Sequence, residues 1–431
     1  MALRKSQTEG SNLAVGDQLR KAIHDQIVQN LEINVNPQST KRRRQDAVSE
    51  LPVAKKLSIA TPVPSSQAHP VQSSNSNYSF PTSWKDLEIA IVCALPLEYD
   101  AVYTLFDDTW DKDYGRTDRD QNIYTHGRLG KFNVVLLVMP NMGKVSAAKT
   151  TTSLRLSYQR LSLVLVTGIC GGVPIPDTGD EILLGDVVVS RHIVQYDLGR
   201  QYPEEFETKD TTEDRFGRAP PSIRHLLAIL ETNQAREKME SLAASYLQDI
   251  QRRAARKVRG SDYRYPGASN DLLFEPGYQH RQGLSKSLSI KSLKQKIRGS
   301  SSPYGMSCEA AGCDIQNTIQ RERVEEKIHL EKQGRSTEAQ APLIFLGTIG
   351  SGDTVMKTAE ERDKIASLHD LIAFEMEGAG IWDETPCIII KGVCDYADSH
   401  KNKYWQEFAA ATAASATKAL LGFYVQRGSA K

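Results

Sequence analysis

Two stretches of sequence decide the fold: Leu163-Val-Leu-Val-Thr-Gly-Ile-Cys-Gly-Gly172 and Cys387-Ile-Ile-Ile-Lys-Gly-Val-Cys-Asp395. Both begin as buried strands, because strands that are hydrophobic on both faces occur in parallel sheets covered by helices. The first strand is expected over 163–167, ending in a glycine-rich turn at 168–172. Similar apolar runs lie at 87–94, 133–139, 186–190 and 342–346, with helical segments between them. The pattern predicts an α/β fold, a three-layer α/β/α sandwich with a mostly parallel, mixed central sheet.

The composition is that of an ordinary globular protein. Of the 431 residues, 39% are hydrophobic and 25% are charged, and the formal net charge is +1. A balance this near neutral excludes a protein whose whole surface binds nucleic acid. No apolar run reaches about 18 residues, so no membrane-spanning helix is predicted, and the first residues lack the apolar core of a secretion signal. We expect reduced thiols and a cytoplasmic or nuclear location, or both.

The chain divides into a tail and one large domain. Residues 62–84 hold four Pro and seven Ser and carry no Asp, Glu, Lys or Arg, which predicts a flexible linker. Upstream, Leu19, Ile23, Ile27 and Leu31 form one stripe of a short amphipathic helix. The predicted organisation is a disordered tail over 1–85, a domain over 86–425 with an insert at about 200–340, and a short tail over 426–431.

Two basic clusters lie in the N-terminal tail. They are Lys41-Arg42-Arg43-Arg44 and Lys55-Lys56. Exposed basic clusters on a flexible chain suit the acidic groove of an import receptor, so they resemble a bipartite nuclear import signal. A solubilising run of charge is the alternative.

Acidic residues follow three of the predicted strands. Glu98 follows the first, Glu375 and Glu377 follow the apolar run 371–374, and Asp395 follows the run 387–393. Ligands gather at the carboxyl ends of strands in open α/β sheets. Two carboxylates with different pKa values are the apparatus for cleaving a glycosidic bond. Helix capping is the alternative role for acids at these positions.

Seven motifs occur in an order typical of one enzyme superfamily. They are Ile91-Val-Cys-Ala-Leu-Pro-Leu-Glu-Tyr99, Met142-Gly-Lys-Val-Ser-Ala-Ala148, Val166-Thr-Gly-Ile-Cys-Gly-Gly-Val173, Leu184-Gly-Asp-Val-Val-Val-Ser190, Ile349-Gly-Ser-Gly-Asp353, Phe374-Glu-Met-Glu-Gly-Ala379 and Gly392-Val-Cys-Asp-Tyr-Ala-Asp-Ser-His-Lys401. Residues 86 to 425 therefore resemble the nucleoside phosphorylase superfamily. They resemble most closely its methylthioadenosine/S-adenosylhomocysteine nucleosidases and the phosphorylase-type domains of fungal NLR-like proteins.

The resemblance implies cleavage of the N-glycosidic bond of a purine nucleoside or nucleotide. It implies that Asp395 is the acid at purine N7, that Glu98 activates the attacking water, and that Glu377 holds the ribose hydroxyls. Such carboxylates suit a transition state with oxocarbenium character. The other substrate-binding positions that it implies are Met376, Glu375, Gly168, Ile169, Cys170 and Gly171.

Two departures from the family pattern favour hydrolysis over phosphorolysis. Related bacterial phosphorylases place an Arg and a Ser near the glycine-rich turn, where this chain has Val166 and Ile169. Neither side chain can donate a hydrogen bond to phosphate. A phosphate-dependent phosphorylase is the alternative, because backbone amides or a distant Arg can also hold an anion.

The basic region over residues 252–298 has twelve Lys or Arg against three acids, a local charge of +9. It is a solvated surface, a nucleic-acid patch or a lid over the 5′ side of the substrate. A lid would favour a phosphorylated purine such as ATP. The candidate 5′-side residues are His400, Lys401, Lys403 and Arg281.

No cofactor and no metal are expected, because the spacing of Cys308, Cys313 and His329 does not match a zinc motif. The expected partners are a purine substrate and a second copy of the chain in a homo-oligomer, with no membrane and no nucleic acid. The rival function is that of a non-catalytic nucleotide sensor in an NLR-like system, and a nuclear nucleic-acid binder is a third possibility. Retention of Glu98, Glu377 and Asp395 favours an enzyme.

Overall fold

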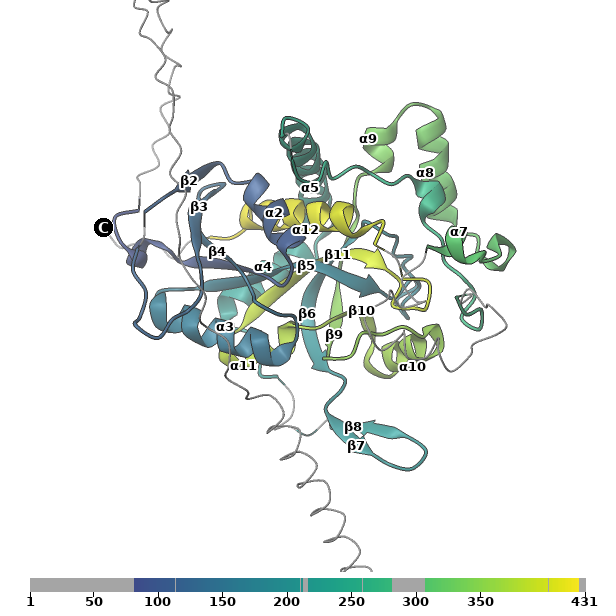
Figure 1. Ribbon diagram of the computed structural model, residues 1–431, viewed down its shortest axis with the longest axis horizontal. Coiled ribbons are helices and arrows are strands. Elements are labelled where there is room, and N and C mark those ends of the chain that lie inside the picture. The colour runs from purple at the N-terminus through teal and green to yellow at the C-terminus, as the bar shows by residue number, and fades with distance from the viewer. Residues whose placement is uncertain are drawn as a thin grey trace, which may run out of the picture. The chain divides into compact units, whose positions relative to one another are not determined.

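The computed structural model describes residues 81–112, 114–209, 211, 216–257, 259–280, 307–401 and 403–425. Its central element is a mixed β-sheet. Within this part of the chain the sheet has nine strands (Figure 1). In spatial order they are β10 (Leu371–Glu375), β9 (Ile344–Ser351), β6 (Val187–Gln195), β11 (Cys387–Asp395), β5 (Leu163–Gly172), β1 (Ile89–Cys93), β4 (Phe132–Val138), β3 (Thr125–Leu129) and β2 (Asp108–Trp110).

The centre of the sheet is parallel. β11, β5, β1 and β4 are parallel neighbours, as are β6, β9 and β10, while β6 runs antiparallel to β11. The central strands are buried along most or all of their length, as expected for a sheet covered on both faces. The prediction of a mostly parallel, mixed sheet is therefore confirmed.

The far end of β5 closes the sheet on itself. β10 pairs with β9 on one side and, over two residue pairs, with β5 on the other, at Ala373–Gly172 and Phe374–Gly171. The prediction that residues 168–172 form a turn is thus wrong. They continue the strand because β11 and β10 both supply ladder partners there, and because glycine lets the flanking chains approach closely.

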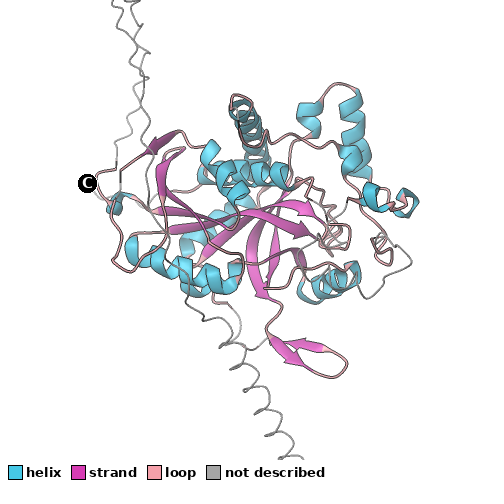
Figure 2. Cartoon of the chain, viewed as in Figure 1, coloured by secondary structure: helices cyan, strands magenta, loops and turns pink. Residues whose placement is uncertain are grey.

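Helices cover both faces of the sheet (Figure 2). α12 (Gln406–Leu421), α2 (Pro96–Thr104) and α5 (Asn233–Ala254) form one layer, in which α12 contacts β11, β5 and both other helices. α3 (Lys144–Ser157) and α11 (Gly378–Glu384) contact each other in the opposite layer. The arrangement is the predicted three-layer sandwich.

Other elements lie around this core. They are η1 (Trp84–Asp86), β7 (Gly199–Gln201), β8 (Phe206–Thr208), α4 (Pro221–Leu230), η2 (Ala268–Asn270), α7 (Cys308–Ala311), η4 (Ile315–Asn317), α8 (Glu322–Lys332), α9 (Ser336–Ala339) and α10 (Ala359–His369). The segment expected to be an insert therefore supplies part of the helical layer through α5. The predicted tail helix and the clusters at 41–44 and 55–56 lie outside the described residues. Among those described, no helix is both long and apolar enough to cross a membrane.

α12 lies unusually close to β11. A Cβ atom on Gly392 would lie 2.0 Å from the carbonyl oxygen of Ala409, a separation that atoms do not tolerate. The alanine-rich face of α12 matches this approach, because its side chains add little thickness between helix and strand. The close packing fixes the strand whose last residue is Asp395.

A buried ion pair anchors the chain just after β11. The Arg321 guanidinium donates to Asp271 Oδ1 at 2.7 Å, and the Tyr396 hydroxyl donates to the same oxygen at 2.7 Å. The side chains of Arg321 and Asp271 are 2% and 3% exposed, so neither charge has water as an alternative partner. The cluster therefore ties the segments around residues 271 and 321 to the turn that follows Asp395.

Arg321→Ala should destabilise the fold strongly, because Asp271 would remain buried without a cation. Breaking such a pair typically costs about 3–5 kcal/mol. Urea unfolding followed by circular dichroism measures the loss. Arg335→Ala is the control, since Arg335 pairs with Glu338 on the surface and its removal should leave the midpoint unchanged. Equal midpoints for the two variants would contradict the assignment.

Candidate active site

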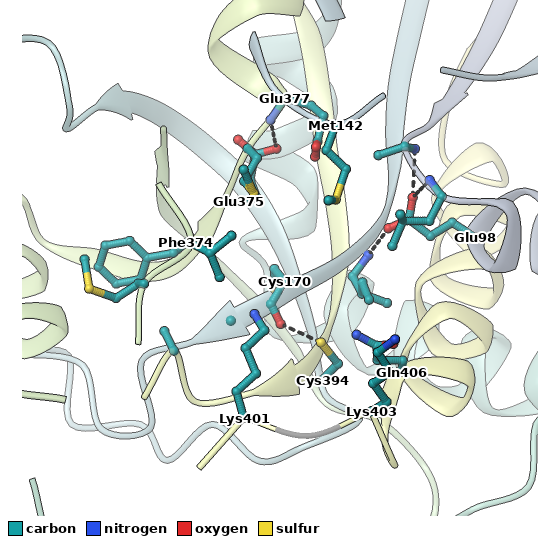
Figure 3. Close-up of a pocket in the computed structure, with 18 of the residues that line it drawn as sticks. Glu98, Met142, Cys170, Phe374, Glu375, Glu377, Cys394, Lys401, Lys403 and Gln406 are labelled. Atoms are coloured by element: carbon teal, nitrogen blue, oxygen red, sulfur yellow. Dashed lines mark hydrogen bonds between the residues drawn. The ribbon is translucent and has the colours of Figure 1, made fainter. Parts of the chain in front are cut away.

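A cavity of about 370 Å³ lies at the carboxyl ends of β1, β5, β10 and β11 (Figure 3). The parallel strands β1, β5 and β11 bring their following residues to one edge of the sheet. The end of β10 reaches the same place because β10 pairs, in antiparallel direction, with the last residues of β5. The lining residues are Ala94, Leu95, Leu97, Glu98, Met142, Ile169, Cys170, Gly171, Thr354, Val355, Met356, Phe374, Glu375, Met376, Glu377, Cys394, Ala397, Lys401, Lys403 and Gln406. Most of the wall is apolar, and the charged groups lie at a few places on it.

Glu98 lies in the first turn of α2 with only 2% of its surface exposed. Its carboxylate accepts hydrogen bonds from the backbone N–H groups of Ala94 and Leu95 on one oxygen, at 2.8 and 2.9 Å, and of Ile169 on the other, at 2.8 Å. Burial raises the pKa of Glu98, and the Lys391 ammonium only partly opposes this. The result is a fixed carboxylate that is a stronger base than an exposed one.

Gly168 leaves the space that Glu98 occupies. A Cβ atom at this position would lie 2.2 Å from Glu98 Oε1. The absence of a side chain at Gly168 therefore leaves room for the Glu98 carboxylate, but Gly168 itself does not line the cavity. The neighbouring Ile169, Cys170 and Gly171 do line it.

A buried lysine lies among three glutamates. Lys391, in the middle of β11, is fully buried and contacts Glu377 Oε2 at 2.9 Å and Glu375 Oε2 at 3.8 Å. Burial lowers the pKa of Lys391, but Glu377, Glu98 and Glu375 together raise it above its ordinary value. Lys391 is therefore the cation that balances the acidic side of the cavity.

Glu375 and Glu377 have different environments. Glu375 accepts hydrogen bonds at 3.0 Å from the backbone N–H groups of Glu377 and Gly378, where α11 begins. Burial raises the pKa of Glu375, while Lys391 opposes that rise. Glu377 is held by Lys391 and lines the cavity together with Met376. Both acids therefore line the cavity, but Glu375 also shapes the turn, whereas Glu377 makes the closer contact with Lys391.

Asp395 lies beside the cavity, in contact with three residues of its wall. Its Oδ2 atom is 2.8 Å from Lys401 Nζ and accepts a hydrogen bond from the Cys394 thiol at 3.2 Å, while Oδ1 accepts the N–H of Ala397. Lys401 and Cys394 line both the main cavity and a smaller one, of about 50 Å³, that Asp395 lines. Burial lowers the pKa of Lys401, but Asp395 raises it above its usual value. Asp395 and Lys401 therefore form an ion pair at the wall of the cavity.

The candidate residues for the 5′ side lie in different places. Lys401 and Lys403 line the cavity, and Lys403 is exposed at its mouth. His400 is turned away from the main cavity and lines the smaller one. Arg281 lies outside the described residues. Among the residues that the structure describes here, Lys403 is thus the cation best placed to meet an anionic substituent.

Several functional positions were missed at the level of sequence. Lys391 was read as one residue of an apolar strand, although a single lysine inside Cys387-Ile-Ile-Ile-Lys-Gly-Val393 is itself a signal of a buried partner. Met142, Phe374 and Gln406 line the cavity but have no polar pattern that marks them. Burial raises the pKa values of the two thiols that line the cavity, Cys170 and Cys394, which disfavours their thiolate forms.

Comparison with known proteins supports the family resemblance. Residues 88–259 match the family model of the phosphorylase superfamily. This part of the chain is therefore similar to the phosphorylase superfamily. An NLR-like protein (nucleotide-binding leucine-rich repeat) of Hyaloscypha variabilis is 29% identical over 343 residues, which cover 78% of this chain and 29% of that protein. The chain thus corresponds to less than a third of its relative's length, and both resemblances seen in the sequence are confirmed.

Solved structures of superfamily nucleosidases are similar to the chain at low identity. A putative methylthioadenosine/S-adenosylhomocysteine nucleosidase of Francisella philomiragia is 15% identical, with a TM-score of 0.43, over 78% of this chain and 98% of that one. A mutant futalosine hydrolase of Helicobacter pylori is 17% identical, with a TM-score of 0.43, over 78% of this chain and 99% of that one.

Lys391→Met should destabilise the phosphorylase-like domain in a pH-dependent way. Burial already raises the pKa values of Glu98 and Glu375, and without the Lys391 cation nothing opposes that rise, so their folded pKa values lie further above the unfolded ones. Stability gained from proton uptake is present at low pH and lost as pH rises through the folded pKa values. The melting temperature should therefore fall more, relative to wild type, at about pH 8 than at about pH 5.

Lys418→Met is the matched control for this measurement. Lys418 is also buried, but its partner Asp107 has a side chain that is 23% exposed and can regain water. Its loss of melting temperature should be smaller and should not grow with pH. A loss for Lys391→Met that is independent of pH would show that the charge balance has been misassigned.

Proposed function

We propose that this chain hydrolyses the N-glycosidic bond of a purine nucleoside or nucleotide and releases the free base. The observation that carries the proposal is the set of acids around one cavity: Glu98 and Glu377 line it, and Asp395 contacts its wall through Lys401. The volume of about 370 Å³ falls within the range of ~300–1,000 Å³ typical of small-molecule sites. Its apolar wall suits the faces of a purine and a sugar.

In the proposed reaction the bond between the sugar C1′ and the base nitrogen breaks as positive charge develops on the sugar. The Asp395–Lys401 pair delivers a proton to N7, so the base departs as a neutral molecule. Glu377 accepts hydrogen bonds from the ribose hydroxyls, and Lys391 balances its charge. Carboxylates that are already fixed in place stabilise the developing cation without having to reorganise.

Glu98 is the proposed general base. It takes a proton from the water that attacks C1′, and its three backbone hydrogen bonds hold it toward the sugar. The backbone N–H of Ile169 is occupied by Glu98, and the side chains of Val166 and Ile169 are apolar. A phosphate dianion would therefore meet a carboxylate and few free donors, which favours water as nucleophile.

The residues at the mouth of the cavity bear on the 5′ substituent of the proposed substrate. Exposed Lys403 at the mouth favours a phosphorylated substrate such as ATP, whereas Met142, Val355 and Met356 favour an apolar 5′ group.

A second function is supported by the NLR-like relative: binding of a purine nucleotide without cleavage, as a sensor. A homo-oligomer is also proposed, because Val145 and Leu156 on α3 are 81% and 57% exposed, and α3 begins two residues after the cavity residue Met142.

A chromatographic screen tests the reaction. Adenosine, inosine, guanosine, methylthioadenosine, AMP and ATP are each incubated with the protein, with and without phosphate, and free base is measured. We expect base release from at least one of them without phosphate. Strict dependence on phosphate would make the protein a phosphorylase, and tight binding with no release would favour the sensor.

Asp395→Asn should lower turnover by about 10²–10⁴-fold, the usual contribution of a general acid, with little change in melting temperature. Asn preserves size and hydrogen bonding but cannot carry the proton. Asp107→Asn is the control, since it changes another Asp–Lys pair, of 2.6 Å, outside the cavity. Early melting with normal turnover per folded molecule would show that Asp395 only supports the fold.

A further inference from the structure

Four potential metal ligands converge at the end of the smaller cavity. Their side-chain ligand atoms all lie within 4.8 Å of one another. The members of this Cys2His2 cluster are His280, Cys308, Cys313 and His400. Cys308 is 28 residues after His280 and 92 residues before His400, so the cluster joins three separate parts of the chain.

Three of the six separations between ligand atoms match those of a tetrahedral zinc site, and none of the six exceeds 4.8 Å. Cys313 Sγ is 3.3 Å and Cys308 Sγ is 3.7 Å from His280 Nδ1, and Cys308 Sγ is 3.5 Å from His400 Nδ1. Zinc bonds of about 2.3 Å to sulfur and about 2.0–2.1 Å to nitrogen place tetrahedral ligands about 3.3–3.8 Å apart. An ion at the centre of the cluster would therefore need little movement of its ligands.

Both histidines are positioned by groups around the cluster. His400 Nε2 is 2.9 Å from the carbonyl oxygen of Tyr278, which accepts its N–H and leaves the Nδ1 lone pair facing the cysteines. The ring stacks on Phe274, with centroids 3.9 Å apart. The backbone N–H of His280 donates to Ser399 Oγ at 2.9 Å. A hydrogen bond on the far nitrogen is the usual way in which proteins orient a ligating histidine.

The charge of the cluster also suits a divalent ion. Two thiols that lose their protons on binding become two thiolates, which neutralise one Zn²⁺, and the neutral imidazoles add no charge. Both histidines are buried, at 5% and 7% exposure, so a neutral complex is well matched to the site. Four protein ligands leave no open position, which is typical of structural zinc.

We propose that the Cys2His2 cluster binds one structural zinc ion. The ion joins α7 and the segment around His280 to the loop that follows β11. In that loop His400 directly precedes Lys401, the partner of Asp395, so the metal fixes the backbone next to the proposed acid pair. The sequence spacing of the two cysteines was compared with that of His329, and the site was therefore not predicted. His329 is exposed on α8 and contacts Gln333.

Metal analysis of the full chain tests the proposal without reference to activity. The protein is purified from zinc-supplemented cells without chelator, its affinity tag is removed, and zinc is measured by mass spectrometry. We expect about one zinc per chain, falling below about a tenth in Cys308→Ser and Cys313→Ser. His329→Ala, which removes the exposed histidine, should keep its full content.

Cobalt substitution supplies a second readout. Co²⁺ added to chelator-treated protein should give the strong visible bands of tetrahedral coordination and a thiolate-to-cobalt charge-transfer band, both lost in Cys313→Ser. Chelation should also lower the melting temperature of wild type but not of Cys308→Ser. Absence of zinc and of the cobalt spectrum in folded wild type, equal zinc in the cysteine variants, or a Cys308–Cys313 disulfide detected by mass would each overturn the proposal.

Discussion

The candidate site depends on one buried charge, the ammonium group of Lys391, and on its pairing with nearby glutamates. Lys391 lies on β11, next to the central strand β5, and is fully buried from water. Glutamates from α2, the end of β10 and the start of α11 surround it. α2 follows β1, whereas the other two glutamates lie on the single segment that joins β10 to α11. The lysine therefore allows acids from distant parts of the chain to be buried together, which repulsion would otherwise prevent.

In the candidate site, the backbone hydrogen bonds that hold the Glu98 carboxylate also connect parts of the fold. Glu98 takes its hydrogen bonds from the turn before α2 and from β5, so it links two neighbouring parallel strands while facing the cavity. Gly168 and Gly392 provide space on the two sides of this arrangement, one for a carboxylate and one for α12. A change at either glycine would act on the reacting groups through packing alone.

Much of the fold was predictable from sequence, because buried parallel strands are continuous apolar runs and β1, β5 and β11 follow that pattern. The acids at the strand ends were predictable for the same reason, since strand direction fixes the edge at which they meet. Strand β5 was predicted too short because its last residues are glycines, whose propensity suggests a turn, while pairing with β10 and β11 holds them extended. Tertiary pairing of this kind leaves no local signal.

The position of Lys401 against Asp395 and the convergence of His280, Cys308, Cys313 and His400 could not be predicted either. The first depends on how the chain turns between residues 395 and 401, and the second depends on how long connections return to the sheet. A rule based on sequence spacing describes neither. The placement of Glu98 beside Ile169 belongs to the same class, because it depends on the register between β1 and β5.

The position of β11 in the sheet has a consequence for synthesis of the chain. This strand is the last one in sequence, yet it lies between β5 and β6, and α12, which covers it, follows later still. Until about residue 421 has left the ribosome, the strands on both sides of the gap present unpaired edges and an uncovered apolar face. Completion of this domain is therefore a late event in its synthesis, and shorter nascent chains expose the kind of surface that chaperones and proteases recognise.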